Sequence, residues 1–471
     1  MLEDVSIYPK NYDVIVIGGG NAALCAAISA RDLGVSVLVL EKSNEVFRGG
    51  NSRHTRNIRY THPAANDWLT GPYPEEECFN DLIRVTGGNT TENLARLCIR
   101  ESYNIGDWMV AHGAMFQPSM RGTLHLGRTN SFFLGGGRGL MNGYYAFAKK
   151  NGIDIMYESP VVDIAMEGSV FKSVTIKNAE GRHIQIYGKT VVIAAGGSQA
   201  NPGFLAKHWG DAAYNFRVRG CPYDTGEVLE MLLNNGVQSV GDPTQGHMVA
   251  VDARAPKVDG GIVTRLDCVP FSVVVNKHAQ RFYDEGEEFW PKRYAIWGRL
   301  VAGQDDQIGH CIIDSKSIDL FMPSVFPPVE ANSLEELARK LNLDVDTFLK
   351  TIKEFNDAVV PGGNFNPDEL DGCHTNGITP AKTNWARPIN EPPYYGYALA
   401  PGITFTYQGT KVNEKAHVLM QDGSESPNVF ACGEIMSGNI LGKGYMAGFG
   451  MTIGTVFGRI AGTEAGKYVK R

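Results

Sequence analysis

The sequence predicts an α/β chain in which a Rossmann-like domain is split around an inserted α+β capping domain. Apolar strands that end on glycine occur toward both ends of the chain, at 14–20, 190–197 and 428–433. Between them the pattern changes, because prolines become frequent, the strands shorten and a helical segment follows. The middle of the chain therefore indicates an inserted domain. We expect the Rossmann-like domain over 8–244 and 400–471 and the capping domain over 245–399.

Composition and charge exclude several classes of protein. The chain has 471 residues, above the size at which one hydrophobic core usually stops growing. Its formal net charge of −7 argues against nucleic acid as a partner. No apolar run approaches the roughly 18 residues of a membrane span, and the start lacks a signal-peptide pattern, so we expect a cytoplasmic protein without direct membrane insertion. The eight cysteines include no C-x-x-C pair, which argues against disulfides, a metal site and an iron–sulfur cluster.

The first strand runs into a glycine turn and an alanine-rich helix, the order found in dinucleotide-binding βαβ units. Gly18 allows the tight turn, and Gly20 lets the backbone approach a pyrophosphate at the helix N-terminus. Glu41 closes the next strand, 36–40, where a carboxylate accepts hydrogen bonds from a ribose. An ordinary α/β unit with a glycine-rich turn is the alternative.

The placement of the Rossmann-like pieces at both ends of the chain favours FAD over a nicotinamide dinucleotide, whose domain is usually one block. A glycine cluster at 135–139 could be a second fingerprint for NAD, but no strong apolar strand precedes it. We expect there a loop and a helix that lead to the next strand of the same sheet. The residues expected to bind FAD are Gly18, Gly20, Ala22, Ala23, Glu41, Lys42, Gly49, Gly50, Asn51, Ser52, Val162, Ala195, Gly196, Thr225, Gly226, Gly433, Glu434 and Gly448.

Several segments resemble the flavoproteins of the fumarate reductase and succinate dehydrogenase superfamily. They are 18–27, 48–52, 194–197, 224–227, 280–285, 433–434 and 457–462, and the resemblance covers nearly the whole chain. Within that superfamily, 48–57, 73–77 and 132–137 resemble the tricarballylate dehydrogenases. The resemblance implies that FAD is reduced as a saturated polycarboxylate, tricarballylate, is oxidised to cis-aconitate.

The resemblance also implies roles for particular residues. In the family an arginine downstream of an Arg-Phe-x-x-Glu segment carries the proton; the spacing falls near Phe289, and Arg293 is the best match. His247 lies where the family places a substrate-binding histidine. Such chemistry needs a base and cations that bind carboxylates. We therefore expect catalytic roles for Arg293, His247 and Tyr445, and substrate binding by Arg56, Lys443 and Arg265.

Three alternatives stay open at this point. The segment around Tyr445 also resembles the glycine-tyrosine loop of the 3-ketosteroid Δ1-dehydrogenases, in which a tyrosine polarises a ketone. A fumarate-reductase-like enzyme is another alternative. A flavoprotein electron carrier is the third, although a carrier needs an exposed flavin rather than an inserted domain.

The mode of FAD binding and the route of its electrons follow from the same resemblance. The histidine that carries the flavin in succinate dehydrogenases falls near Ser52 here, so we expect noncovalent FAD despite the nearby His54. The reduced FAD must pass its electrons on, and the resemblance implies a membrane-associated iron–sulfur protein as the acceptor.

Overall fold

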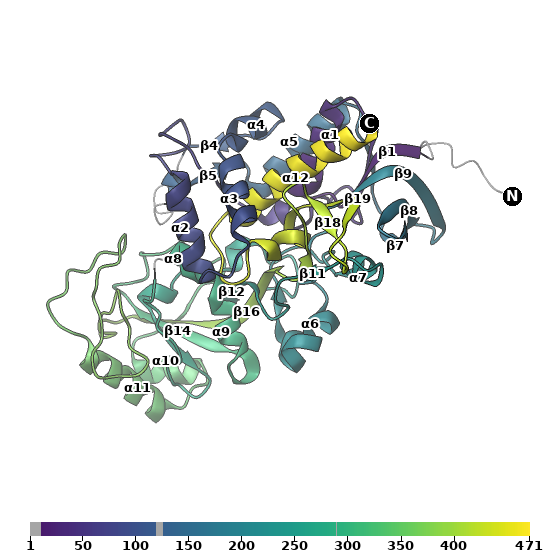
Figure 1. Cartoon of the computed structure of the whole chain (residues 1–471). Helices are drawn as coiled ribbons and strands as arrows, with labels where there is room; N and C mark the ends of the chain where they lie inside the picture. The colour runs from purple at the N-terminus through teal and green to yellow at the C-terminus, as the bar shows by residue number, and fades with distance from the viewer. Residues whose placement is uncertain (1–10, 119–125, 289) are drawn as a thin grey trace.

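The computed structural model describes residues 11–118, 126–288 and 290–471. Figure 1 shows two lobes, with both ends of the chain, purple and yellow, in one lobe and the green middle of the chain in the other. No helix among the described residues is both long and apolar enough to cross a membrane. All eight cysteines are free and buried.

An eight-stranded sheet forms the centre of the first lobe. Its parallel strands lie in the order β19 (Glu425–Ala431), β9 (His183–Ile193), β1 (Asn11–Ile17), β2 (Val37–Leu40) and β6 (Asp154–Met156). The antiparallel strands β18 (His417–Leu419), β7 (Val161–Glu167) and β8 (Val170–Lys177) extend it. Ile17 pairs with Leu40 on one side and with Ile193 on the other, so three strand ends meet at one edge. This arrangement confirms the predicted Rossmann-like fold.

Two helices from opposite ends of the chain pack together on this sheet, namely α1 (Asn21–Asp32) and α12 (Phe449–Val469). The buried Asn21 donates from Nδ2 to the Met451 carbonyl oxygen, 3.2 Å away, and to Thr455 Oγ1, 3.0 Å away. Because these bonds fix the first turn of α1 to α12, the glycine turn before α1 is held by both halves of the split domain.

The glycine cluster at 135–139 begins α5 (Gly136–Lys150) and serves packing. A Cβ at Gly137 would lie 2.1 Å from the Ser52 carbonyl oxygen, so only glycine lets α5 approach the 3₁₀ turn at Gly50–His54. The chain then enters β6, which pairs in parallel with β2. The predicted loop, helix and next strand of the same sheet are confirmed.

A six-stranded sheet forms the second lobe. β16 (Tyr394–Thr406) pairs with β10 (Arg217–Val218), β12 (Gly246–Asp252), β14 (Gly309–Asp314) and β15 (Val329–Ala331), and β13 (Val273–Asn276) pairs with β14. The helices α8 (Trp290–Arg293), α9 (Trp297–Ala302), α10 (Leu334–Lys340) and α11 (Val345–Ala358) accompany it. We call this sheet with α8 to α11 the cap lobe. Its strands come from residues 217–406.

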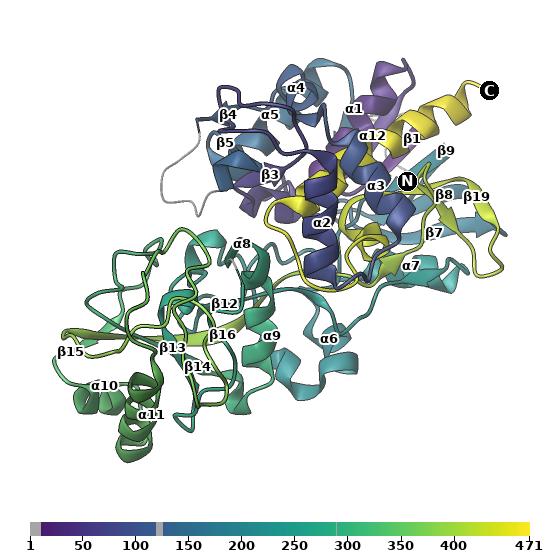
Figure 2. The ribbon, with the colours of Figure 1, turned by 60° about the vertical axis from the view of Figure 1, so that its left-hand side comes forward.

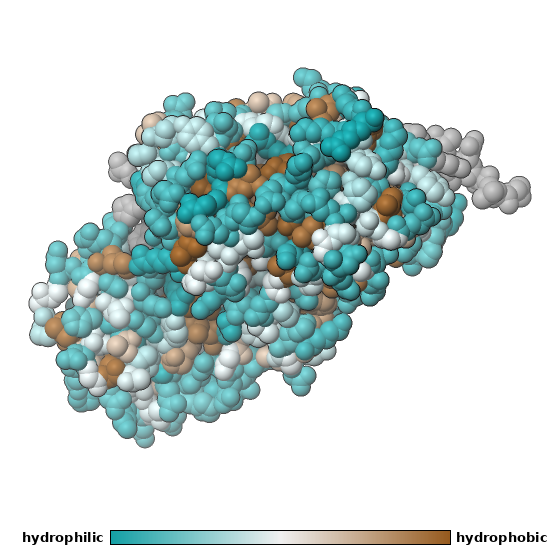
Figure 3. All heavy atoms as spheres, viewed as in Figure 1, coloured by the Kyte–Doolittle hydropathy of each residue, from teal (hydrophilic) through white to brown (hydrophobic). Residues whose placement is uncertain are grey.

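The remaining elements cover the first lobe and the junction. They are α2 (Glu75–Thr86), α3 (Glu92–Glu101), α4 (Ile105–Ala111), α6 (Pro202–Trp209), α7 (Glu227–Asn234), a small sheet of β3 (Asn57–Arg59), β4 (Phe116–Gln117) and β5 (Asn130–Phe133), and the pair β11 (Ser239–Val240) and β17 (Gly409–Thr410). Figure 2 shows α2 at the junction, near α8 of the cap lobe. The face in Figure 3 is mostly hydrophilic, with apolar residues in small groups.

Candidate cofactor and substrate site

A cavity with about 1400 Å³ of space, part of it open to solvent, lies where β1, β2, β9 and β19 end. Ligands in Rossmann-like folds bind at this edge of the sheet. Fourteen of the residues predicted to bind FAD line it: Gly18, Gly20, Ala22, Glu41, Lys42, Gly50, Asn51, Ser52, Ala195, Gly196, Thr225, Gly226, Gly433 and Glu434.

The glycine turn and the start of α1 form the anion-binding part of the cavity. Gly18 has a φ of 112°, and a Cβ there would lie 2.2 Å from the Ala194 carbonyl oxygen, so the turn requires glycine. Gly20, which precedes α1, offers no side-chain cap, and Ser52 Oγ accepts a hydrogen bond from the Asn21 N–H at 3.0 Å. The other backbone N–H groups of the first turn of α1 and the positive end of the helix dipole therefore suit a pyrophosphate.

Glu41 lies at the end of β2 with its carboxylate against the glycine turn. Its side chain is buried, and Oε1 accepts a hydrogen bond from the Ser43 N–H at 2.8 Å. A Cβ at Gly19 would lie 2.0 Å from Oε2. Burial raises the pKa of this carboxyl, and the hydrogen bonds from Ser43 oppose the rise. The carboxylate is thus fixed at the cavity wall, where a ribose would need an acceptor.

Replacing Glu41 with alanine is expected to weaken FAD binding without unfolding the protein. Hydrogen bonds to a charged acceptor contribute about 1.5–3 kcal/mol, so the FAD dissociation constant should rise by about 10- to 150-fold. Fluorescence titration of the apoprotein with FAD measures this change, with Glu45→Ala on the exposed surface as the control. Equal FAD affinity in the two variants would show that Glu41 only ends a strand.

Two carboxylates, the buried Asp224 and the half-buried Glu434, also line the cavity. Gln199 Nε2 donates to Asp224 Oδ2 at 2.8 Å, and the Thr406 N–H donates to Glu434 Oε1 at 3.0 Å. Burial raises the pKa of Asp224 to about 7 and also raises that of Glu434, which the neighbouring Asp224 reinforces. Carboxyl groups held in this way offer hydrogen-bond partners to the hydroxyl groups of a ribityl chain. The donor and acceptor set therefore fits FAD.

Four residues predicted to bind FAD do not line this cavity. Val162 points outward with 37% of its surface exposed, and its neighbour Val161 lines the cavity, because successive residues of a strand face opposite sides. Ala23, a residue of α1, is buried in the core, and a Cβ at Gly49 would meet the Met141 side chain. Gly448 instead lines a second, smaller cavity.

The smaller cavity, with about 380 Å³ of space, part of it open to solvent, adjoins the first. Both are lined by His54, Thr55, Arg219, His247 and Tyr445. A ligand in the smaller cavity would therefore lie beside a cofactor in the larger one.

Three arginines surround the smaller cavity: Arg56, Arg219 and Arg265. Arg219 follows β10 and is buried, and among the described residues its Nη1 has no hydrogen-bond partner. Arg265 donates from Nη2 to Asp267 Oδ2 at 2.7 Å, so one carboxylate offsets part of the charge. Burial, and then the charge of Arg265, lower the pKa of Arg56 and of Arg219 to about 10. This excess of buried positive charge favours an anionic ligand.

Three rings line the smaller cavity, and two of them, His247 and Tyr445, also line the larger one. His247 stacks on Tyr445 with the ring centroids 4.0 Å apart and the planes at 6°, and it meets Tyr294 edge to face at 5.2 Å. Burial, Arg219 and Arg265 hold the pKa of His247 well below its usual range, so the imidazole is neutral. Among the described residues, its Nε2 has no hydrogen-bond partner. A neutral imidazole and two phenols can accept or donate hydrogen bonds to an oxygen of a ligand.

Two residues predicted to act on the substrate, Arg293 and Lys443, line neither cavity. Arg293 donates from Nε to Glu287 Oε2 at 2.6 Å and from Nη2 to the Tyr283 hydroxyl at 2.9 Å, so its guanidinium is bound elsewhere. Lys443 is exposed. His247, Tyr445, Arg56 and Arg265 do line the smaller cavity, whereas Phe289 lies outside the described residues.

Tyr294 and Arg219 line the smaller cavity but were not predicted as site residues. Tyr294 directly follows Arg293, and the Arg-Phe-x-x-Glu segment gives no signal that separates these two side chains. Arg219 lies in no motif, and no sequence signal pointed to it.

A family model and a curated relative match most of this chain. The model of the FAD binding domain family matches residues 13–448. The NADH:fumarate oxidoreductase of Klebsiella pneumoniae (strain 342) is 27% identical over 470 residues, which cover 98% of this chain and 48% of that protein. This chain therefore spans about half the length of that relative.

Solved structures show the same fold. A flavocytochrome c3 fumarate reductase in its open conformation superposes with a TM-score of 0.76 and 21% identity, over 99% of this chain and 80% of that one. The 3-ketosteroid Δ1-dehydrogenase of Sterolibacterium denitrificans superposes with a TM-score of 0.76 and 17% identity, over 98% of this chain and 100% of that one.

Proposed function

The chain belongs to the FAD binding domain family, so FAD is its cofactor, and from that premise we propose that it is an oxidoreductase acting on a CH–CH bond beside a carboxylate. The first candidate reaction is the oxidation of tricarballylate to cis-aconitate, with the fumarate-reductase-like reverse direction as a variant. The observation that supports it is the group of three arginines, Arg56, Arg219 and Arg265, around a cavity that adjoins the FAD cavity.

The arginines bind and polarise the substrate in this proposal. Guanidinium groups bind carboxylates with two parallel hydrogen bonds, and they stabilise the negative charge that develops when the neighbouring carbon loses its proton. Arg219 Nη1 has no partner among the residues that the structure describes and can serve this purpose, whereas Arg265 already shares its charge with Asp267. When bound, FAD supplies the acceptor for the hydride that leaves the adjacent carbon.

Tyr294 takes the proton in place of the predicted Arg293. Burial raises the pKa of its phenol, while the charges of Arg265, Arg219 and Arg56 act in the opposite direction. The guanidinium of Arg265 lies over the ring, 4.7 Å from its centroid. In the oxidation the ionised phenol accepts the proton, and in the reduction the neutral phenol donates it. One proton and one hydride leave the substrate as its C=C bond forms.

A ketone-directed dehydrogenation is the second candidate, and the two phenols favour it. Tyr294 and Tyr445 line the same small cavity, and a hydrogen bond from a phenol can polarise a carbonyl. The Tyr445 oxygen already accepts a hydrogen bond from the Gly450 N–H at 3.0 Å, which leaves its own O–H free to point toward the cavity. The buried arginines have no role with a neutral ketone, which places this candidate second.

The reduced FAD passes two electrons onward, and we propose a membrane-associated iron–sulfur protein as the acceptor. We also propose that FAD is bound noncovalently. Ser52 occupies the position of the flavin-linking histidine, and its Oγ accepts a hydrogen bond from the Asn21 N–H at 3.0 Å. The neighbouring His54 is paired through Nε2 with Asp259 Oδ1 at 2.7 Å.

Acid precipitation of the FAD-loaded protein is expected to release the flavin into the supernatant. Absorbance of the supernatant and of the redissolved pellet measures the two fractions. Flavin retained in the pellet would contradict noncovalent binding, and peptide mapping would then locate the linked residue, with His54 examined first.

Anaerobic bleaching of the bound flavin tests the proposed function. Stopped-flow absorbance would be recorded with tricarballylate, succinate and a 3-ketosteroid at equal concentrations. Rapid bleaching by a carboxylate alone supports the first candidate, and bleaching by the ketosteroid alone supports the second. The dithionite-reduced protein would be mixed with fumarate and cis-aconitate to test the reverse direction. If no compound bleaches the oxidised flavin or reoxidises the reduced flavin, both candidate reactions are contradicted.

A further inference from the structure

We propose that the ion pair between Lys292 and Asp81 holds the segment that carries Tyr294 over the smaller cavity. Both would then be positioning residues, because they act on proton transfer through Tyr294 and touch neither cavity. The inference rests on the proposed function and adds to it a contact between α2 and α8.

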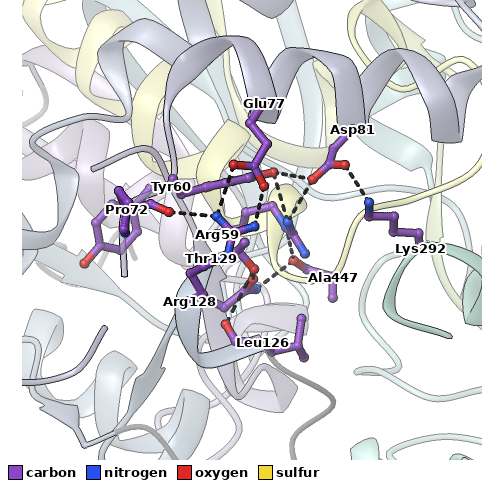
Figure 4. A network of polar contacts seen from close by, with 12 residues as sticks. Arg59, Tyr60, Pro72, Glu77, Asp81, Leu126, Arg128, Thr129, Lys292 and Ala447 are labelled. Carbon is purple, nitrogen blue, oxygen red and sulfur yellow. Dashed lines mark hydrogen bonds and ion pairs between the residues drawn. The ribbon is translucent and has the colours of Figure 1, made fainter. Parts of the chain in front are cut away.

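Asp81, on α2, is the centre of a polar network at the junction of the lobes (Figure 4). Its Oδ1 lies 2.6 Å from Lys292 Nζ of α8. Its Oδ2 accepts a hydrogen bond from the Tyr73 hydroxyl at 2.9 Å and lies 3.8 Å from Arg59 Nη1. Because first-lobe groups fix one oxygen of this carboxylate, the other oxygen is a fixed anchor for the cap lobe.

The same network reaches the loop that carries Tyr445. Arg59 Nε donates to the Ala447 carbonyl oxygen at 3.0 Å, and Arg59 Nη1 donates to the Tyr73 hydroxyl at 3.0 Å. Lys292 lies two residues before Tyr294, and Ala447 lies two residues after Tyr445. One network therefore fixes both segments whose phenols line the smaller cavity.

Exposure and bond length distinguish the contacts that join this segment to the first lobe. The side chains of Lys292 and Asp81 are 21% and 13% exposed, so solvent and salt screen their attraction only in part. Arg84 also pairs with Glu288, but the Arg84 side chain is 57% exposed, and exposed pairs contribute little. The Ala447 N–H donates to the Pro291 carbonyl oxygen at 3.4 Å, which is a long bond.

Replacing Lys292 with methionine in the FAD-loaded protein tests the inference without a substrate. We expect faster amide hydrogen exchange over 290–302 and stronger quenching of flavin fluorescence by iodide, because the segment no longer stays over the cavity. Lys277→Met is the matched control, since Lys277 pairs with Asp306 at 2.7 Å within the cap lobe. Lys292→Arg should restore both signals to wild type, and Asp81→Asn should change them as Lys292→Met does.

Turnover of an active carboxylate provides the second measurement. We expect Lys292→Met to lower kcat by about 10- to 100-fold, the cost of a displaced reacting group, with KM nearly unchanged because the arginines stay in place. Exchange and quenching equal to those of Lys277→Met would overturn the inference whatever the turnover. Raised exchange and quenching, in a protein that acts on no tested compound, would support the ion pair's role and contradict the proposed function.

Discussion

Replacing Tyr294 with phenylalanine is expected to slow flavin reduction by the substrate by about 10²–10⁴-fold, the usual effect of losing a general acid–base group. The change removes only a hydroxyl group. The ring keeps its contacts with His247 and with the Arg265 guanidinium, so FAD and carboxylate affinity should stay near those of the wild type. Anaerobic stopped-flow absorbance at saturating substrate measures the rate.

The pH dependence of the same rate gives a second test of Tyr294. In the oxidation the ionised phenol is the active form, so the wild-type rate should rise as the pH approaches the raised pKa of this phenol. The phenylalanine variant should lose that rise. Arg293→Lys is the neighbouring control, because the Arg293 guanidinium is bound to Glu287 and should matter little. A large loss of rate in Arg293→Lys, with a normal rate in Tyr294→Phe, would show that Arg293 and not Tyr294 transfers the proton.

The parallel part of the fold could be predicted because local patterns encode it. The βαβ unit from β1 to β2 and the glycine-ended strands β9 and β19 each carry their signal within a few residues. The 13-residue strand β16 has no clear local signal, since it contains Pro401 and two glycines, which argue against a central strand. Its pairing with four other strands outweighs that local preference.

The difference between local patterns and contacts of distant segments also explains how much of the candidate site could be predicted. The larger cavity is built from turns at strand ends, so the sequence motifs themselves place the residues that line it. The smaller cavity is assembled from distant loops: Arg56 follows the 3₁₀ turn Gly50–His54, Arg219 follows β10, and Arg265 and Tyr294 belong to short turns of the middle segment. Such turns have no periodicity that shows which side chain points inward, as Arg293 and Tyr294 illustrate, since only Tyr294 lines the smaller cavity.

Replacing Arg219 with glutamine is expected to weaken binding of the carboxylate substrate by about 2–5 kcal/mol, the cost of removing one partner of a buried charge pair. The dissociation constant should then rise by about 30- to 4000-fold. Arg217→Gln is the matched control, since Arg217 lies two residues earlier, donates from Nη2 to the Ala253 carbonyl oxygen at 2.7 Å and lines neither cavity. The perturbation of the flavin spectrum by bound ligand measures affinity.

A substrate with one carboxylate replaced by an amide separates the roles of charge and shape. Wild-type protein should bind the amide more weakly than the acid, and Arg219→Gln should bind both about equally, because the guanidinium that distinguishes them is gone. If wild-type protein binds the amide as well as the acid, Arg219 does not hold a carboxylate. The buried charges of Arg56 and Arg265 would then need another anion, and the phenols Tyr294 and Tyr445 would make a ketone the better candidate substrate.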